Sequence, residues 1–216
     1  MNPEDIRREK NRVMQRVQTA LDAVPDRIHS QNSYKVAEKL IRLPEFQRAN
    51  LLGIFVGFDS EVDTVRLMEA ALNLDKRVAA PTTSVAQRRL VWREVKNPDA
   101  DIDLGPLGFP QPLPTCREVD ASQFELVAVP GLVWDEKGRR LAHWPGYFDR
   151  LLAQIPRIFK VGLVFDLQVV KDLAELAGPA LVDALITEDQ VRRLRMMAET
   201  RPESRRIPGG PKGYKG

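Results

Sequence analysis

The sequence predicts an α/β fold in which a mostly parallel central sheet carries helices on both faces. Short apolar runs of strand character alternate along the chain with segments in which apolar residues recur every three or four positions. This alternation is typical of strand–helix–strand units, whose strands lie parallel and whose helices cover the sheet. With 216 residues, 43% of them hydrophobic, the chain is long enough to bury a sizeable core.

The first elements expected are two helices and a strand. Apolar residues within residues 4–24 recur at spacings of three and four, which places them on one face of a helix. A second helix is expected over residues 33–43, because Pro44 stops it. The short apolar run 51–56 has strand character, and residues 57–60 then form a turn.

The chain alternates in the same way up to about residue 190. Asp63 or Thr64 is suited to cap the next helix, and Pro81 is expected to end the strand that follows it. Residues 97–114 are rich in Pro, Gly and Asp, which is typical of a loop. The remaining expected elements are, in order, a helix to Leu74, strands at 77–80, 89–95 and 124–129, a helix at 146–154, a strand at 159–165, a helix at 167–176 and a strand at 182–186.

Composition limits the class of protein. The net charge of +3 is mildly basic and suits an anionic small ligand. The single cysteine, Cys116, excludes an internal disulfide and fits a reducing compartment. The N-terminal residues are charged and carry no apolar signal-peptide core, and the apolar run 51–58 is too short to span a bilayer. We therefore expect a cytoplasmic protein that does not enter a membrane.

The chain is expected to form one domain over residues 1–200, followed by a tail. Residues 201–216 consist largely of Arg, Lys, Gly and Pro, which is typical of a disordered segment. A basic tail is able to contact RNA, but no RNA-recognition motif or interleaved aromatic pattern accompanies it. A solubilising tail on a monomer is favoured, and nucleic acid is not expected as a partner.

The segment from Val129 to Arg150 joins a predicted buried strand to a predicted helix that starts near Gly146. A helix N-terminus offers unpaired N–H groups and the positive end of the helix dipole, and both favour phosphate. Arg139 and Arg140 add positive charge, although arginines in loops are most often solvated. A strand, a basic glycine-bearing loop and a helix start together predict a phosphate-binding site.

Acidic residues follow several of the predicted strands. Glu61, Asp149 and Asp166 lie beyond strand ends, where ligands gather in open parallel sheets, whereas Asp183 lies inside a strand pattern. Lys10 stands in the apolar stripe of the first helix. Either it extends out of the helix edge into solvent, or it directs a positive charge at an anion.

These segments resemble, in order and approximate spacing, the motifs of the 5-formyltetrahydrofolate cyclo-ligases, also called methenyltetrahydrofolate synthetases. Residues 53–64 resemble that family's strand and Glu-Val-Asp-Thr motif, and residues 129–150 resemble its nucleotide loop. Shorter matches at residues 43–47, 108–112 and 183–188 keep the family's order. The resemblance covers roughly residues 5 to 190 and implies a cyclo-ligase-like, NagB/RpiA/CoA-transferase-like fold.

The resemblance implies the ATP-dependent conversion of 5-formyltetrahydrofolate to 5,10-methenyltetrahydrofolate. In that reaction ATP phosphorylates the formyl oxygen, the N10 nitrogen attacks the activated carbon, and phosphate leaves. Phosphorylation is needed because an amide-like oxygen is a poor leaving group, so the protein has to position two ligands and neutralise charge. The implied cofactors are ATP and Mg²⁺, and the implied partner is a small-molecule folate.

The resemblance also implies roles for residues of this chain. Glu61 and Tyr147 would bind the folate substrate. Asp149 would help to hold magnesium, a hard cation that prefers oxygen ligands. The residues that would bind ATP are Lys10, Arg140, Gly146 and Tyr147.

The nucleotide loop departs from the family's pattern of alternating glycines. Ala142 and Trp144 stand at glycine positions, Pro145 precedes the glycine that is kept, Gly146, and Phe148 replaces a second tyrosine. Glycine permits close approach of the backbone to phosphate, and proline removes an N–H donor. A second hypothesis therefore stays open, a non-catalytic cyclo-ligase-like protein that retains a folate or nucleotide pocket.

Overall fold

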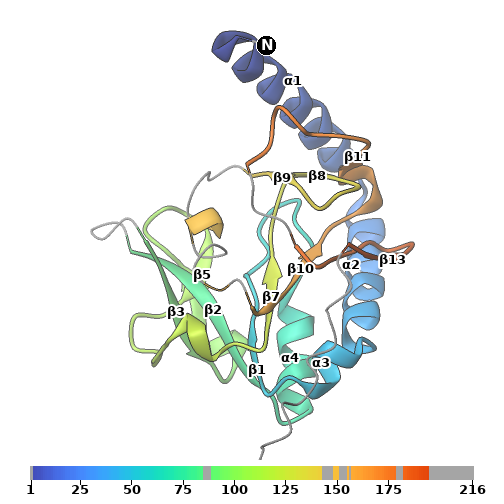
Figure 1. Cartoon of the computed structure of the whole chain (residues 1–216). Coiled ribbons are helices and arrows are strands. Elements are labelled where there is room, and N and C mark those ends of the chain that lie inside the picture. Colours follow the sequence, from blue (N-terminus) through green and yellow to red (C-terminus); the bar gives the residue numbers. More distant parts are fainter. Residues whose placement is uncertain are drawn as a thin grey trace, which may run out of the picture.

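The computed structural model describes residues 2–84, 89–142, 148–150, 155, 157–178 and 182–194. Within this part of the chain the main sheet contains β1 (Leu51–Gly53), β2 (Arg77–Ser84), β3 (Arg89–Val95), β6 (Glu118–Val119), β7 (Leu126–Val129), β10 (Phe159–Leu163), β12 (Ala184–Ile186) and β13 (Val191–Arg193). Their order across the sheet is β13-β12-β10-β7-β1-β2-β3-β6. The five strands from β12 to β2 run parallel, and β13, β3 and β6 are antiparallel to their neighbours. The expected mostly parallel α/β sheet is confirmed (Figure 1).

Helices and two smaller sheets surround this sheet. The helices are α1 (Pro3–Asp22), α2 (Asp26–Ile41), α3 (Pro44–Arg48), α4 (Val65–Asn73) and α5 (Pro98–Asp101). In one small sheet β4 (Ile102–Leu104) pairs with β5 (Pro110–Pro112), and in the other β8 (Val133–Asp135) pairs with β9 (Arg140–Leu141) and β11 (Val169–Val170). Short 3-10 turns occupy Ala121–Gln123 and Asp166–Gln168.

Both faces of the main sheet are buried. Alternate strand residues such as Leu52 and Leu126 pack with the apolar faces of α1, α2 and α4. Their neighbours Leu51 and Val127 face the other side, into a cluster that contains Trp92, Phe124, Trp134 and Ile155. Burial on both faces explains why these strands are continuous apolar runs in the sequence.

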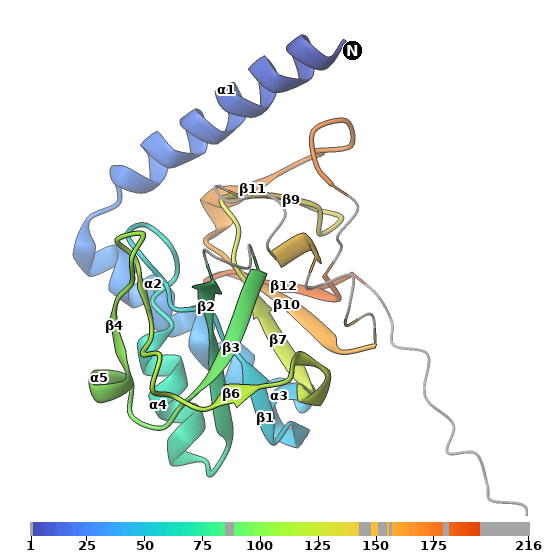
Figure 2. The same ribbon diagram turned by 90° about the vertical axis from the view of Figure 1, so that its left-hand side faces the viewer.

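Helix α1 lies across one end of the molecule, and its N-terminal half projects away from the sheet (Figures 1 and 2). Its buried residues are Val13, Val17 and Leu21, which belong to the stripe that the sequence predicts. The helix is capped by Asn2, whose side chain accepts a hydrogen bond from the Asp5 N–H. Lys10 is half-buried on this stripe, one turn before Val13.

Prolines are the source of several differences from the predicted boundaries. Helix α2 begins earlier than residue 33, directly after Pro25, and Pro44 starts α3 as well as following α2. Proline suits the first turn of a helix because its missing N–H would have no partner there. Strand β2 also continues through Pro81. The carbonyl of Ala79 points toward β1, so the nitrogen of Pro81, two residues later, points to the same side. The pairing of β1 with β2 ends at Gly53, opposite Ala79, so no hydrogen bond of the ladder is lost at Pro81.

The expected loop over residues 97–114 contains α5, β4 and β5, so this prediction was wrong. The ladder between β4 and β5 uses the N–H groups of Gly105 and Leu113. Pro110 and Pro112 occupy the alternate positions, whose nitrogens face away from β4. Proline-rich composition therefore concealed a hairpin whose register never requires a proline N–H.

The helix expected over residues 167–176 does not form. Residues 166–168 make a 3-10 turn and Val169–Val170 pair with Trp134 and Asp135 of β8. Tertiary pairing decides this segment, because Gln168 donates to the carbonyls of Gly131 and Leu132 and so fixes it against the β7–β8 connection. Strand β13 was not predicted either.

Two other predictions fall on parts of the chain that are only partly described. Of the helix expected over residues 146–154, residues 148–150 are described and are helical. The basic tail, residues 201–216, lies outside the described residues.

Candidate active site

A cavity of about 830 Å³ opens where β1 and β7 end, beside Pro81 of β2. The connections that follow β1 and β7 form its wall, together with the C-terminal part of α1 and the β4–β5 hairpin. This is the edge at which open parallel sheets bind ligands. The described lining residues are Gln18, Leu21, Asp22, Phe55, Val56, Phe58, Asp59, Ser60, Glu61, Pro81, Leu107, Gly108, Phe109, Pro110, Pro130, Gly131, Leu132, Arg140, Ala142, Phe148 and Gln168.

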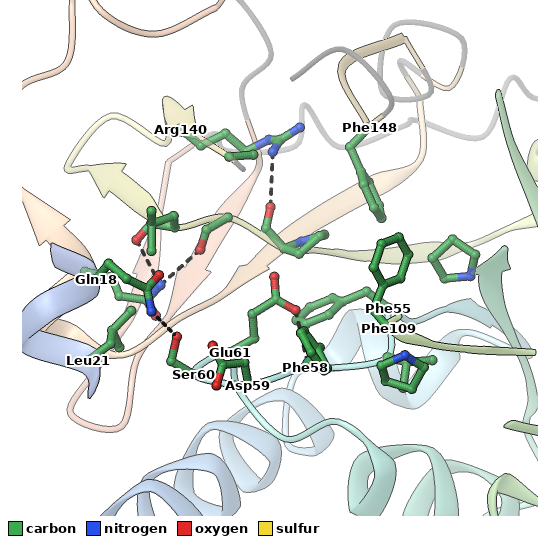
Figure 3. A pocket seen from close by; sticks show the side chains of 18 of the residues that line it. Gln18, Leu21, Phe55, Phe58, Asp59, Ser60, Glu61, Phe109, Arg140 and Phe148 are labelled. Atoms are coloured by element: carbon green, nitrogen blue, oxygen red, sulfur yellow. Dashed lines mark hydrogen bonds between the residues drawn. The ribbon is translucent and has the colours of Figure 1, made fainter. Parts of the chain in front are cut away.

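Much of this wall is aromatic. Phe55 is buried at the end of β1, Phe58 is 48% exposed on the loop that follows, and Phe109 comes from the β4–β5 hairpin. Figure 3 shows Phe148 above Phe55, on the same side of the cavity as Phe109. The flat apolar faces of such rings are suited to a planar heteroaromatic ligand.

Glu61 lies in the cavity wall on the loop after β1 (Figure 3). Its carboxylate accepts a hydrogen bond of 3.3 Å from the Phe58 N–H, and its own N–H donates to the Phe58 carbonyl, so residues 58–61 form a closed turn. Burial raises the pKa of Glu61 to about 7 and the charge of Asp59 adds to this, while the Phe58 N–H acts in the opposite direction. Near neutral pH this carboxyl group therefore exists in both the accepting and the donating form.

The raised pKa predicts how stability depends on pH. The pKa of Glu61 is about 7 in the folded protein and 4.5 in the absence of burial, so between these values the folded state binds the proton more tightly. Stability contributed by this group is therefore complete below about pH 4.5 and is lost as the pH rises through about 7. We expect the melting temperature of the wild type to fall relative to that of Glu61→Gln between about pH 5 and pH 8, as measured by scanning fluorimetry. Parallel melting curves for the two proteins would contradict this expectation.

The loop that carries Glu61 is fixed at both of its ends. Thr64 is fully buried, and its hydroxyl donates to the Phe55 carbonyl at 2.6 Å and accepts from the Gly57 N–H at 2.9 Å. The helix that follows starts as predicted, because the Asp63 carboxylate accepts from the Val65 N–H at 3.0 Å. The Glu-Val-Asp-Thr segment thus places one residue in the cavity and uses two others to hold it there.

Arg140 is the only cationic residue among the described residues that line the cavity. Its guanidinium is buried and donates to the Pro130 carbonyl at 3.2 Å and to the Asp149 carboxylate at 2.8 Å. Its Nε is buried and has no hydrogen-bond partner among the described residues. Burial lowers the pKa of Arg140, and the charge of Asp149 opposes that change. Arg140 therefore provides a dehydrated positive charge on one side of the cavity.

The structure brings several of the predicted site residues together. Glu61 and Arg140 share the cavity, Asp149 is paired with Arg140, and the Phe148 ring lies 5.9 Å from the Arg140 guanidinium. Gly146 and Tyr147 lie outside the described residues. Lys10 is not part of the described wall: it precedes Gln18 on α1 by about 12 Å along the helix axis.

Other charged residues from the sequence analysis are engaged in structural contacts. Asp183 is buried and accepts from the Lys160 N–H at 2.8 Å. Asp166 accepts weakly from the Thr187 hydroxyl at 3.4 Å. Arg139 is paired with Asp135 and Asp172, so it is neither a solvated loop charge nor directed at the cavity.

Some wall residues were missed in the sequence. Gln18 on α1 donates to the Ser60 hydroxyl at 2.9 Å and so joins α1 to the Glu61 loop (Figure 3). Gln168 is buried and holds Gly131 and Leu132 in place. Neither glutamine stands in a motif, and their role depends on contacts between distant segments, so the sequence carries no signal for them.

Neither a membrane-crossing helix nor a cluster of metal-binding side chains occurs among the described residues. Their helices include none that is long and apolar enough to cross a membrane. In the same residues no three side chains of the types His, Cys, Asp and Glu gather in a way that could hold a metal ion. A single carboxylate such as Asp149 fits Mg²⁺ only where phosphate oxygens and water supply the other ligands.

Comparisons with known proteins point to one family. The sequence profile of the 5-formyltetrahydrofolate cyclo-ligase family matches residues 4–176. A probable 5-formyltetrahydrofolate cyclo-ligase of Schizosaccharomyces pombe is 24% identical over 199 residues, which cover 85% of this chain and 97% of the relative. The Escherichia coli K12 enzyme of that name is 26% identical over 160 residues, 73% and 88% of the two chains. An NMR structure of Aquifex aeolicus 5,10-methenyltetrahydrofolate synthetase superposes with a TM-score of 0.76 and 28% identity, covering 90% of this chain and 99% of that one.

Proposed function

Because this chain belongs to the 5-formyltetrahydrofolate cyclo-ligase family, we propose that it converts 5-formyltetrahydrofolate and ATP to 5,10-methenyltetrahydrofolate, ADP and phosphate. The observation that carries the proposal is the cavity at the ends of β1 and β7, which holds Glu61 and Arg140 in one space. The reaction requires one site that binds both a heterocycle and a phosphoryl group. A carboxyl group is suited to bind the first and a cation the second.

The folate is proposed to bind along the wall formed by Glu61, Phe55, Phe58 and Phe109. A reduced pteridine carries ring N–H groups and an amino group, which donate hydrogen bonds, and a ring with apolar faces. The Glu61 carboxyl group accepts from these donors, while the phenylalanines pack against the ring. Tyr147 is proposed to complete this wall where the two ligands meet.

The phosphates of ATP are proposed to bind beside Arg140. Its charge is already dehydrated, so its attraction to a phosphoryl group is stronger than that of a solvated arginine. The N–H groups near Gly146 and Tyr147 and the ammonium of Lys10 are proposed as further donors. Asp149 is proposed as the carboxylate that would bind a Mg²⁺ ion carried by the nucleotide. That ion would place additional positive charge beside the phosphates.

The chemistry then depends on alignment. The formyl oxygen attacks the terminal phosphorus of ATP and the bond to ADP breaks, which leaves the formyl carbon activated. N10 attacks this carbon, its proton is lost, and the C–O bond breaks with release of phosphate. Arg140 stabilises charge on the transferred group, and the packed cavity wall holds the formyl oxygen in line and excludes water.

The direct experiment combines purified protein, 5-formyltetrahydrofolate, ATP and Mg²⁺ and follows methenyltetrahydrofolate absorbance. We expect product formation that requires ATP, and a rate reduced at least about tenfold in Lys10→Ala, since a charged phosphate contact contributes roughly 1.5–3 kcal/mol. Absence of product above the Lys10→Ala background would overturn the proposal. Folate binding without turnover would instead establish the non-catalytic relative.

A further inference from the structure

A histidine from a separate helix contacts the loop that carries Glu61. The Nε2 atom of His29, on α2, lies 2.8 Å from the carbonyl oxygen of Glu61. A carbonyl oxygen only accepts hydrogen bonds, so the Nε2–H of His29 is the donor. The two residues are 32 positions apart in the sequence, and no motif connects them.

The imidazole ring is itself held in place. It packs edge-on against the ring of Phe165, with 5.1 Å between ring centroids and an interplanar angle of 70°. Phe165 is 2% exposed and follows strand β10. The Nε2–H donor therefore belongs to a ring that packs against the core rather than to a flexible side chain. It can hold the acceptor, the Glu61 carbonyl oxygen, in one position.

The loop is tied to the body of the protein at other residues, Ser60 to Gln18 and Thr64 to the Phe55 carbonyl, but Glu61 itself has few bonds of its own. The other two hydrogen bonds of Glu61 are made with Phe58, within the turn itself. The turn also contains Asp59 at φ 55°, a conformation that costs energy for a residue with a side chain. Among the described residues, His29 is the only one beyond the turn that hydrogen-bonds to Glu61.

We propose that His29 is a positioning residue, which sets the place of the Glu61 carboxyl group in the cavity by holding the Glu61 carbonyl. The inference rests on the proposed function in one respect, that Glu61 binds the folate. His29 does not line the cavity and touches no reacting atom, so it acts through Glu61.

Two substitutions separate the hydrogen bond from the ring contact. His29→Phe keeps a ring against Phe165 and removes the donor, whereas His29→Gln keeps an N–H donor at a similar distance and removes the ring. We expect His29→Phe to raise the KM for 5-formyltetrahydrofolate by about five- to tenfold with the KM for ATP unchanged, and His29→Gln to restore most of the loss. Gln31→Leu, on the exposed surface of the same helix, is the matched control.

The outcomes are distinct. Weaker binding of 5-formyltetrahydrofolate in His29→Gln but not in His29→Phe would assign the effect to ring packing and overturn the proposal. Changes in the KM for ATP equal to those in the KM for 5-formyltetrahydrofolate would also overturn it. Melting temperatures of all three variants show whether the fold is retained.

A second measurement needs no turnover and therefore separates failure of this inference from failure of the proposed function. The Glu61 carboxyl carbon is followed by NMR through a pH titration, with Glu61→Gln used to assign its signal. We expect the Glu61 titration midpoint to move down toward that of an ordinary glutamate in His29→Phe, because a released turn exposes the carboxyl group to water, and to stay in place in His29→Gln. An unchanged midpoint in His29→Phe would overturn the inference even if the wild type is active.

Discussion

Replacing Arg140 with leucine is expected to lower kcat/KM by about a hundredfold or more, with the loss expressed mainly in the ATP-dependent step. Arg140 is the only cation in the described wall of the cavity, and it is buried with its charge directed between Asp149 and the Pro130 carbonyl. A dehydrated charge of this kind is most effective where negative charge moves between two ligands. Single-turnover measurements at saturating ATP test the effect on chemistry directly.

Matched variants show whether charge or geometry is responsible. Arg140→Lys keeps the charge without the planar, bidentate geometry, so an intermediate loss is expected. Asp149→Asn keeps the shape of the side chain that pairs with Arg140 but removes the negative charge of that side chain. This substitution is expected to weaken the binding of Mg²⁺ more than the binding of folate. Full activity of Arg140→Leu, with unchanged KM for ATP, would place the phosphate site elsewhere.

Replacing Asp135 with alanine is expected to lower the free energy of unfolding by about 3–5 kcal/mol. Asp135 is fully buried. Its carboxylate accepts hydrogen bonds from the N–H groups of Lys137, Arg139 and Leu173 and from the side chain of Arg139. Removal of the carboxylate leaves these donors without a partner, and the charge of Arg139, 16% exposed at its side chain, loses its buried counter-ion.

The measurement is a denaturant or thermal melt. A loss of this size corresponds to a fall in melting temperature of about 10 °C for a chain of this length. Asp172→Ala is the control, because Asp172 pairs with the same arginine but is 46% exposed at its side chain, so its loss is expected to lower stability much less. Equal effects of the two substitutions would show that Asp135 does not organise the turn that leads into β9 and Arg140.

Elements that depend on periodic burial could be predicted from the sequence. The apolar stripe of α1 and the continuous apolar runs of β7 and β10 follow from contacts that every residue of the element shares. The segment after β10 could not be predicted in this way. It has the composition of a helix, but Gln168 and β11 are held by the β7–β8 connection and by β8, which lie far away in the sequence.

The candidate site likewise contains residues that the sequence predicts and residues that only the structure reveals. Glu61 was singled out because it follows a predicted strand, and Arg140 because it lies in the basic loop; the family resemblance suggested their roles, and the fold places both in one cavity wall. His29 and Gln18 could not be predicted, because a hydrogen bond to a distant loop produces no pattern in the sequence.

The sequence by itself determined the family, the parallel sheet and the candidates Glu61 and Arg140, since local spacing and residue type suffice for these. Only the tertiary structure decided which charges are available to a ligand. Arg139 and Arg140 are neighbours in the chain, yet Arg139 is paired with Asp135 away from the cavity, whereas Arg140 is paired with Asp149 and lines the cavity wall. Arg139 lies in the turn and Arg140 is the first residue of β9, so packing, rather than composition, gives each of these arginines its role.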